Sequence, residues 1–205
     1  MRNRENIQAL LELNPDYIGF IFFERSKRYA GEDFDPAITD LIPSHIEKTG
    51  VFVNADPDYV MQKVTQYGLN YAQLHGTESP GYCKRLEGEG IQLIKAFSVD
   101  DEFSFSGMSE YLDFCCYFLF DTRTTLIGGS GKKFNWKILD DYTHSKSFFL
   151  SGGIGPDDIE DVKNMSHLNI HALDINSRFE ISPGLKNIDT IKNFIENIRA
   201  GQDEI

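Results

Sequence analysis

Residues 148–156 read FFLSGGIGP, a short apolar run followed at once by a glycine-rich loop. Similar apolar runs, most of them ending in polar or glycine-bearing residues, recur along the chain and alternate with helical patterns. The runs are Tyr17–Phe22, Gly50–Val53, Tyr71–Leu74, Ile91–Phe97, Cys115–Phe120, Phe148–Leu150 and Ile170–Ile175. Because most of them are apolar on both faces, they are typical of strands in a parallel sheet that is covered on both sides.

Helical segments with start and stop signals separate these runs. Asp56-Pro57 places a capping residue before a proline at the first helical position, and Gly68 follows as the stop. Ser79-Pro80 repeats the device, Asn3 can cap an opening helix, and Phe134–Leu139 is a weaker helical segment after a strand. We therefore expect seven strands and about eight helices, beginning with a helix.

Repeating β–α units predict parallel strands joined by right-handed crossovers. Two architectures satisfy this pattern, an open doubly wound sheet and a closed (β/α)8 barrel, and hydrophobic periodicity does not separate them. Both bind ligands at the carboxyl ends of the strands, where the polar and glycine-rich residues stand here. Since no linker or low-complexity stretch divides the sequence, we expect residues 1–205 to form one domain.

The composition of the chain excludes some classes of partner. The 205 residues are 40% hydrophobic and 25% charged, as in ordinary soluble proteins, and 20 Lys+Arg against 32 Asp+Glu give a net charge of −12. This charge argues against nucleic acid and anionic membranes as partners. Cys83, Cys115 and Cys116 have no metal-ligand spacing, so we expect reduced thiols in a cytoplasmic protein, with Cys115 and Cys116 packed in the core.

Three glycine-bearing or polar loops follow the last three runs: Gly128-Gly129-Ser130-Gly131-Lys132, residues 151–156 with Gly152 and Gly153, and Asn176-Ser177-Arg178. Glycine lets the backbone approach a ligand closely, and backbone N–H groups at helix starts bind phosphate. Loops after the last two strands form the usual phosphate site of a barrel. Each loop taken alone can equally be a tight turn.

Other polar residues stand at or just after strand ends. Asp121 ends an apolar run, where desolvation would favour the protonated form that a general acid needs, although it could also cap a helix or pair with a lysine. His75 follows Gln73-Leu74 and fits a hydrogen-bonding residue better than a metal ligand. Arg28 could hold a carboxylate through two parallel hydrogen bonds, or be a surface charge.

In their order along the chain, these motifs resemble the phosphoribosylanthranilate isomerase family of tryptophan biosynthesis, a group of small (β/α)8 (TIM) barrels. The resemblance covers essentially the whole chain. The matching segments are 19–22 (GFIF), 26–29 (SKRY), 50–54 (GVFVN), 73–76 (QLHG), 94–97 (IKAF), 120–122 (FDT), 128–131 (GGSG), 150–154 (LSGGI) and 174–177 (DINS).

The resemblance implies an Amadori rearrangement of N-(5-phosphoribosyl)anthranilate to 1-(2-carboxyphenylamino)-1-deoxyribulose 5-phosphate, without metal or cofactor. It makes Asp121 the general acid and Arg28 the partner of the anthranilate carboxylate. The remaining expected contacts to this small phosphoribosyl substrate are Gln73, His75, Gly129, Gly152, Gly153, Asn176 and Ser177.

One departure stands out. Family members begin with a short strand of the form Lys-[Ile/Val]-Cys-Gly, whose cysteine is the base, followed by the Met-Arg that stands here as Met1-Arg2. We therefore expect a barrel of seven strands that lacks strand 1, with impaired activity, and a Cys-Gly encoded just upstream. The alternatives are a catalytically impaired phosphate-ester-binding barrel and another phosphosugar barrel enzyme. A monomer and a homodimer both fit the sequence.

Overall fold

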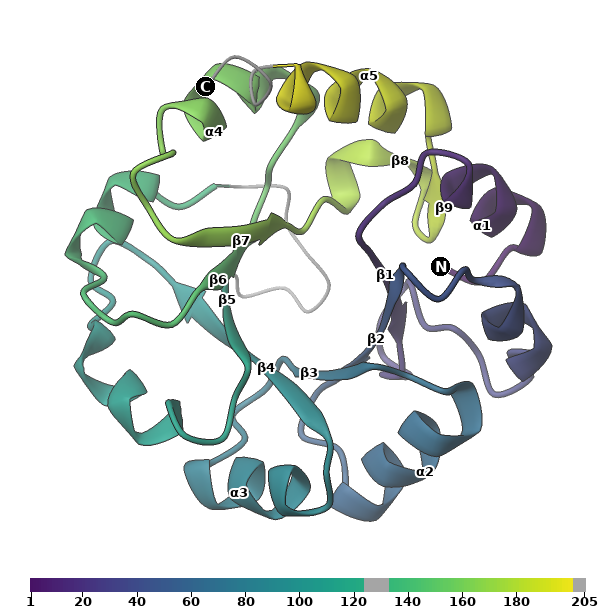
Figure 1. Cartoon of the computed structure of the whole chain (residues 1–205), viewed down its shortest axis with the longest axis horizontal. Helices are drawn as coiled ribbons and strands as arrows, with labels where there is room; N and C mark the ends of the chain where they lie inside the picture. The colour runs from purple at the N-terminus through teal and green to yellow at the C-terminus, as the bar shows by residue number, and fades with distance from the viewer. Residues whose placement is uncertain (124–132, 201–205) are drawn as a thin grey trace.

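The computed structural model describes residues 1–123 and 133–200. Seven parallel strands, each paired with the next in chain order, curl around a common axis (Figure 1). They are β1 (Tyr17–Ile21), β2 (Glu47–Phe52), β3 (Tyr71–Leu74), β4 (Gln92–Val99), β5 (Tyr117–Thr122), β6 (Phe148–Leu150) and β7 (Ile170–Leu173). A doubly wound sheet reverses its strand order part of the way across, so this unbroken order confirms the (β/α)8-type barrel with seven strands.

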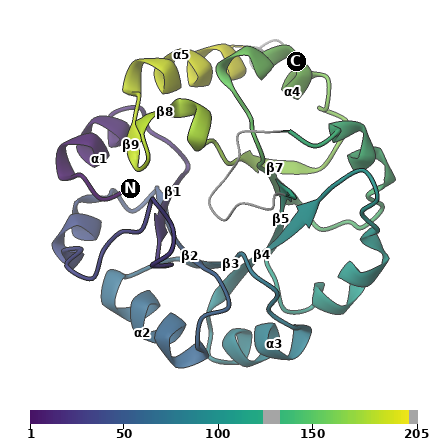
Figure 2. The same cartoon turned by 180° about the vertical axis from the view of Figure 1, so that it is seen from behind.

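Helices surround the strands in both end-on views (Figures 1 and 2). The α-helices are α1 (Arg4–Leu11), α2 (Pro57–Tyr67), α3 (Pro80–Gly88), α4 (Ile159–Lys163) and α5 (Ile188–Arg199). The 3-10 helices are η1 (Pro36–Leu41), η2 (Phe105–Tyr111), η3 (Trp136–Asp141), η4 (Pro156–Asp158) and η5 (Ser177–Phe179), and β8 (Glu180–Ser182) pairs antiparallel with β9 (Leu185–Lys186). Within the described ranges, no helix is long and apolar enough to cross a membrane.

The three capping residues predicted from the sequence each cap the start of a helix. The Asp56 side chain accepts the backbone N–H of Asp58 at the start of α2, and the helix ends at Gly68, whose φ of 55° is left-handed. Ser79 accepts the N–H of Tyr82 at the start of α3, and Asn3 caps α1 in the same way. Each cap satisfies a backbone group that the helix itself leaves unpaired.

Successive side chains of each strand point alternately toward the helices and into the barrel, so the apolar side chains form two buried regions. Phe118 and Phe120 of β5 are fully buried between the sheet and the helices, whereas Leu119 between them points into the barrel. Inside, Leu119 belongs to a cluster whose buried members are Tyr71, Ile94, Ala96, Leu119 and Phe149. Because successive residues of a strand face opposite sides, a strand that is apolar throughout serves both regions.

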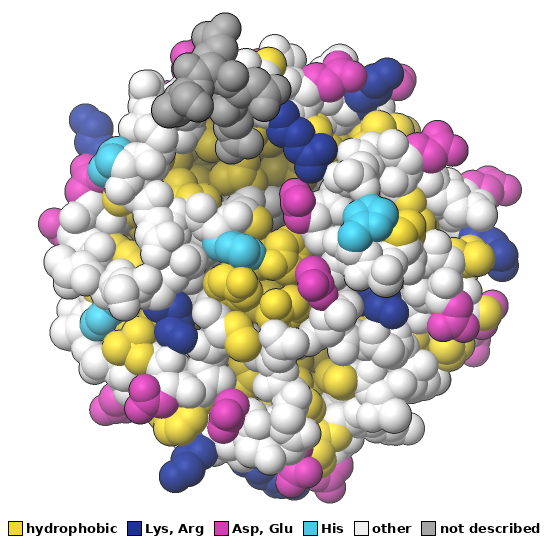
Figure 3. Space-filling view, in the orientation of Figure 1, with side chains coloured by type: hydrophobic (Ala, Val, Ile, Leu, Met, Phe, Trp, Pro, Cys, Tyr) yellow, Lys and Arg dark blue, Asp and Glu magenta, His cyan; other side chains and the backbone are white. Residues whose placement is uncertain are grey.

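Four rings from alternate strands form a layer inside the barrel where the strands begin. Tyr17, Tyr71, Tyr117 and His171 come from β1, β3, β5 and β7, as expected for one layer of a barrel interior. Tyr17 Oη lies 2.7 Å from His171 Nε2, and the His171 ring stacks on Tyr117 with a centroid distance of 4.1 Å. Figure 3 shows this end of the molecule, with histidine and acidic side chains around an apolar, hollowed centre.

Among the described residues, the facing edges of β1 and β7 are not paired with each other. The Met1 amino group lies beside this gap and donates a hydrogen bond to the Gly19 carbonyl of β1 at 3.3 Å. Burial, together with the nearby Lys186, lowers the pKa of this amine to about 5. These two unpaired edges belong to the first and the last of the seven parallel strands that the structure describes.

Two expectations need correction. The predicted run from Cys115 to Phe120 becomes a strand only at Tyr117, and Cys116 is exposed rather than packed in the core, whereas Cys115 is buried. Cys116 lies in a bend just before β5, where its side chain reaches solvent. The segment predicted as a helix over Phe134–Leu139 is a 3-10 helix that begins later, at Trp136.

The ring layer leads to a pH prediction. Burial lowers the pKa of His171 below its usual 6.5, so the folded chain favours the neutral imidazole. The unfolded chain takes up a proton as the pH falls through 6.5 while the folded chain resists it, so His171 makes the folded state less stable at acid pH. We expect the urea-measured free energy of unfolding of His171→Phe to fall less steeply than that of the parent between about pH 7 and pH 5.

A matched substitution at His45, whose ring is exposed and bonds only Asn14 Oδ1 among the contacts described, provides the control. His45→Phe should keep the slope of the parent chain. Equal slopes for His171→Phe and the parent would show that the His171 ring does not resist protonation.

Candidate active site

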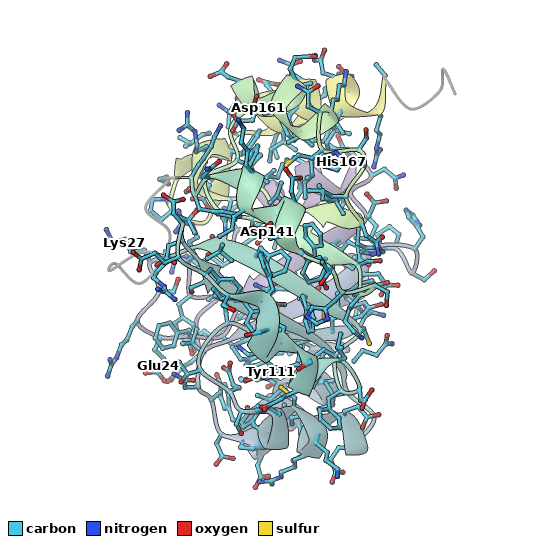
Figure 4. All side chains as sticks on the ribbon, turned by 90° about the vertical axis from the view of Figure 1, so that its left-hand side faces the viewer. Glu24, Lys27, Tyr111, Asp141, Asp161 and His167 are labelled. Carbon is cyan, nitrogen blue, oxygen red and sulfur yellow. The ribbon has the colours of Figure 1, made fainter. Side chains whose placement is uncertain are left out.

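A cavity of about 1060 Å³ runs along the inside of the barrel. Its wall contains the eight candidate residues that the structure describes: Arg28, Gln73, His75, Asp121, Gly152, Gly153, Asn176 and Ser177. Gly129, the ninth, lies outside the described residues. In the side-on view, Glu24 and Lys27 of the loop after β1 mark the end where the strands finish, and His167 lies at the opposite end (Figure 4).

Asp121, at the end of β5, is held by two hydrogen bonds. The backbone N–H of Thr122 donates to its Oδ1 at 2.8 Å, and His75 Nε2 lies 3.1 Å from its Oδ2. The Asp121 and His75 side chains are 26% and 24% exposed, so the carboxyl is reachable from the cavity. A positioned carboxyl of this kind can give a proton to, or take one from, a bound molecule.

A buried ion pair fixes the backbone on either side of His75. Lys95 Nζ of β4 lies 3.0 Å from Glu78 Oε2 and donates to the carbonyls of Leu74 and Gly76 at 3.1 and 2.9 Å. Glu78 in turn accepts the backbone N–H of Gly76 at 3.0 Å. Both charged side chains are almost completely buried, so the loop that carries His75 has few alternative positions.

Arg28 faces a carboxylate that the sequence analysis missed. Its Nε lies 2.8 and 3.0 Å from the two oxygens of Glu180, and its Nη2 lies 2.6 Å from Oε2. The two side chains are only 10% and 3% exposed. A bidentate pair of this kind fixes the plane of the guanidinium, and therefore the direction in which the cation faces the cavity.

Glu180 also joins two further groups at this wall. Its Oε1 accepts the N–H of Gly184 in the β8–β9 hairpin at 3.0 Å and lies 3.6 Å from Lys186 Nζ. Although burial opposes it, the hydrogen bond from Arg28 and the charge of Lys186 hold the pKa of Glu180 below its usual value. Lys186 Nζ donates to Asn176 Oδ1 at 2.8 Å, while burial lowers the pKa of this lysine.

Asp174 is a second carboxyl on the cavity wall that was not among the candidates. Ser151 Oγ donates to its Oδ2 at 3.1 Å. Burial, reinforced by the charge of Asp121, raises the pKa of Asp174. The sequence did carry a signal for it, since Asp174 follows the apolar end of a strand much as Asp121 does.

The loop after β6 needs its glycines. Gly152 and Gly153 have φ values of 88° and 75°, a left-handed backbone that favours glycine. A Cβ added at Gly152 would lie 2.4 Å from Thr122 Oγ1 and 3.1 Å from Asp121 Oδ1. The loop therefore packs directly against the end of β5, close to the candidate acid.

The described part of the chain offers neither a cluster of metal ligands nor a cysteine on the cavity wall. Across residues 1–123 and 133–200, no group of three or more His, Cys, Asp or Glu is placed to hold a metal ion. The described cysteines Cys83, Cys115 and Cys116 are absent from the cavity wall. The wall instead brings together carboxyls, an imidazole, a guanidinium and glycine-rich backbone.

A family model for N-(5'phosphoribosyl)anthranilate (PRA) isomerase matches residues 1–197. A relative called N-(5'-phosphoribosyl)anthranilate isomerase, from Parabacteroides distasonis, is 46% identical over 199 residues, 97% of this chain and 90% of its own. The crystal structure of phosphoribosyl anthranilate isomerase from Thermotoga maritima matches with a TM-score of 0.85 at 33% identity, covering 98% and 96% of the two chains. That of such an isomerase in complex with reduced 1-(o-carboxyphenylamino)-1-deoxyribulose 5-phosphate has a TM-score of 0.83 at 30% identity, covering 98% and 95%.

Gly152→Ala tests the close packing of the loop. Left-handed backbone costs a non-glycine residue about 1–2 kcal/mol, and the clash with Thr122 should add roughly 1–3 kcal/mol. Gly90 is a matched control, because its φ of 81° is also left-handed but nothing lies within 4 Å of an added Cβ. We expect urea denaturation to show a larger loss of stability for Gly152→Ala than for Gly90→Ala, and equal losses would contradict the crowding.

Proposed function

This chain belongs to the N-(5'-phosphoribosyl)anthranilate isomerase family, and we propose that it converts N-(5-phosphoribosyl)anthranilate to 1-(2-carboxyphenylamino)-1-deoxyribulose 5-phosphate with Asp121 as the general acid. The family is one of isomerases in tryptophan biosynthesis. The observation that carries the proposal is the position of Asp121, a partly exposed carboxyl at the end of β5 on the same cavity wall as Arg28 and the Gly152–Gly153 loop.

The proposed reaction begins with ring opening. Asp121 gives its proton to the furanose ring oxygen, the bond between that oxygen and C1' breaks, and the nitrogen lone pair forms a C1'=N double bond. A base then takes the proton from C2', whose electron pair forms the C1'=C2' bond of an enolamine as the C=N pair returns to nitrogen. Protonation of C1' and loss of the 2'-hydroxyl proton give the ketone, so the whole sequence is an isomerisation.

The two ends of the substrate have suitable partners on the wall. We assign the anthranilate carboxylate to Arg28, whose plane Glu180 fixes. We assign the phosphate to the backbone of Gly152 and Gly153 and to the loop at Asn176 and Ser177, because glycine-rich turns let backbone N–H groups approach phosphate oxygens. Holding both ends uses binding energy to orient the reacting carbons between them.

The base is the remaining part of the proposal. The three described cysteines do not line the cavity, whereas the facing edges of β1 and β7 and the buried Met1 amine border it. From the family resemblance we assign the base to a cysteine that a Lys-Ile-Cys-Gly strand would place between these two edges.

Extension of the chain tests the base. Lys-Ile-Cys-Gly joined before Met1 should raise the turnover of freshly made substrate over that of a chain joined to Lys-Ile-Ser-Gly by about 10²–10⁴-fold, the usual contribution of a positioned base. Full activity of the 205-residue chain, or equal activity of the two extended chains, would rule out this base. Phosphate-ester binding without turnover in both extended chains would favour an impaired binding barrel.

Asp121→Asn tests the acid, because the amide keeps the shape of the carboxyl but cannot give up a proton in the same way. We expect kcat/KM of the Lys-Ile-Cys-Gly chain to fall by about 10²–10⁴-fold while its affinity for the product changes little. Asp140→Asn is the matched control, since Asp140 also bonds a histidine, His167, at 2.9 Å but both are exposed. Retained activity in Asp121→Asn would remove Asp121 from the mechanism.

A further inference from the structure

Three side chains at the ends of two strands lie in a hydrogen-bonded row on the cavity wall. Gln73 of β3 is buried, and its Nε2 lies 2.9 Å from His75 Nδ1. On the other side of the ring, His75 Nε2 lies 3.1 Å from Asp121 Oδ2 of β5. Gln73 and His75 reach the same side of β3 because residues two apart on a strand face the same way.

The row defines the tautomer of the imidazole. The Gln73 group that faces Nδ1 is an amide nitrogen, which donates hydrogen bonds and does not accept them. With the amide nitrogen in this position, a neutral ring accepts at Nδ1 and carries its proton on Nε2. This N–H points at Asp121, so the ring offers the carboxyl a donor without a positive charge.

We propose that Gln73 and His75 are positioning residues for Asp121: Gln73 fixes His75 as the Nε2–H tautomer, and this N–H orients the carboxyl and stabilises the carboxylate that forms when Asp121 gives up its proton. The inference rests on the proposed role of Asp121 as general acid and names the residues that prepare it for that role.

A neutral donor suits this task better than a cation. A general acid must be protonated before the reaction and stable as a carboxylate after it, and an imidazolium would favour the carboxylate too strongly at the start. The Thr122 N–H on Oδ1 and the His75 N–H on Oδ2 leave further lone-pair positions for the acidic proton. Among the described residues, the same wall also carries Asp174, whose pKa is raised by burial and by the charge of Asp121, and Lys186, whose charge acts on Asp174 in the opposite direction.

Nuclear magnetic resonance of the ring nitrogens reads the tautomer without any need for turnover. In the parent chain at neutral pH we expect the His75 signals of a neutral ring protonated on Nε2. In Gln73→Glu a carboxylate would face Nδ1, and we expect that nitrogen to become protonated, whereas Gln73→Met should leave it without a fixed partner. A parent spectrum with the proton on Nδ1 would overturn the inference.

Kinetics of two His75 variants distinguish a role in orienting Asp121 from a role in packing alone. The amide of His75→Gln can place an N–H near the former Nε2, whereas the shorter side chain of His75→Asn cannot. In the Lys-Ile-Cys-Gly chain we expect His75→Asn to lose about 10- to 100-fold in kcat/KM, as for loss of a hydrogen bond to a charged group, and His75→Gln to recover most of it.

The pH profile supplies the second readout. Activity that needs a protonated acid falls as the pH rises, and loss of the donor destabilises the carboxylate, so His75→Asn should move this alkaline fall upward by about one to two pH units. His75→Gln should leave it near its original pH. His167→Gln, which alters the exposed His167–Asp140 pair, should change neither rate nor profile.

The two proposals fail in different ways. If Asp121→Asn keeps full turnover, the assigned acid is wrong. If Asp121→Asn loses turnover but both His75 variants keep the rate and pH profile of the parent, Asp121 remains the acid and the positioning role of Gln73 and His75 is wrong.

Discussion

Parallel pairing in strict chain order is the constraint on which the rest of this structure depends. Each strand lies beside the next one in the sequence, so all seven finish at the same rim of the barrel. Groups far apart in the chain therefore meet there: Arg28 contacts Glu180, 152 positions later, and His75 contacts Asp121. The proposed acid, cation and phosphate-binding loops therefore come from different strand ends or from the loops that follow them.

Much of this fold could be predicted from the sequence because its strands are apolar on both faces. Tyr71–Leu74 and Phe148–Leu150 match the predicted runs residue for residue. β2 starts three residues before the predicted Gly50, since its backbone pairing with β1 continues through polar residues at the barrel end that hydrophobicity does not mark. The helix predicted after β5 is a 3-10 helix, a difference that hydrophobic periodicity does not indicate.

Site residues could be predicted from the sequence where a polar residue directly follows an apolar strand. Polar residues after apolar runs, such as Asp121 and His75, lie on the cavity wall, although their roles remain predictions. Glu180 could not be found in this way, because it follows no strand of the barrel. Its importance comes from its ion pair with Arg28, which is far away in the sequence. Asp174 had the same local signal as Asp121, and only the three-dimensional structure shows that the two carboxyls influence each other.

The buried pair of Lys95 and Glu78 has a consequence for how this barrel can diverge. Loss of either partner would leave the other charge buried and unpaired. Replacement of both by apolar groups of similar volume can be nearly neutral for the stability of the fold. Yet Lys95 also donates to two carbonyls beside His75, so an apolar exchange would remove the hydrogen bonds that fix the loop carrying His75. Among descendants of this sequence, these two positions should therefore mutate jointly, and chiefly in lineages that no longer depend on the enzyme.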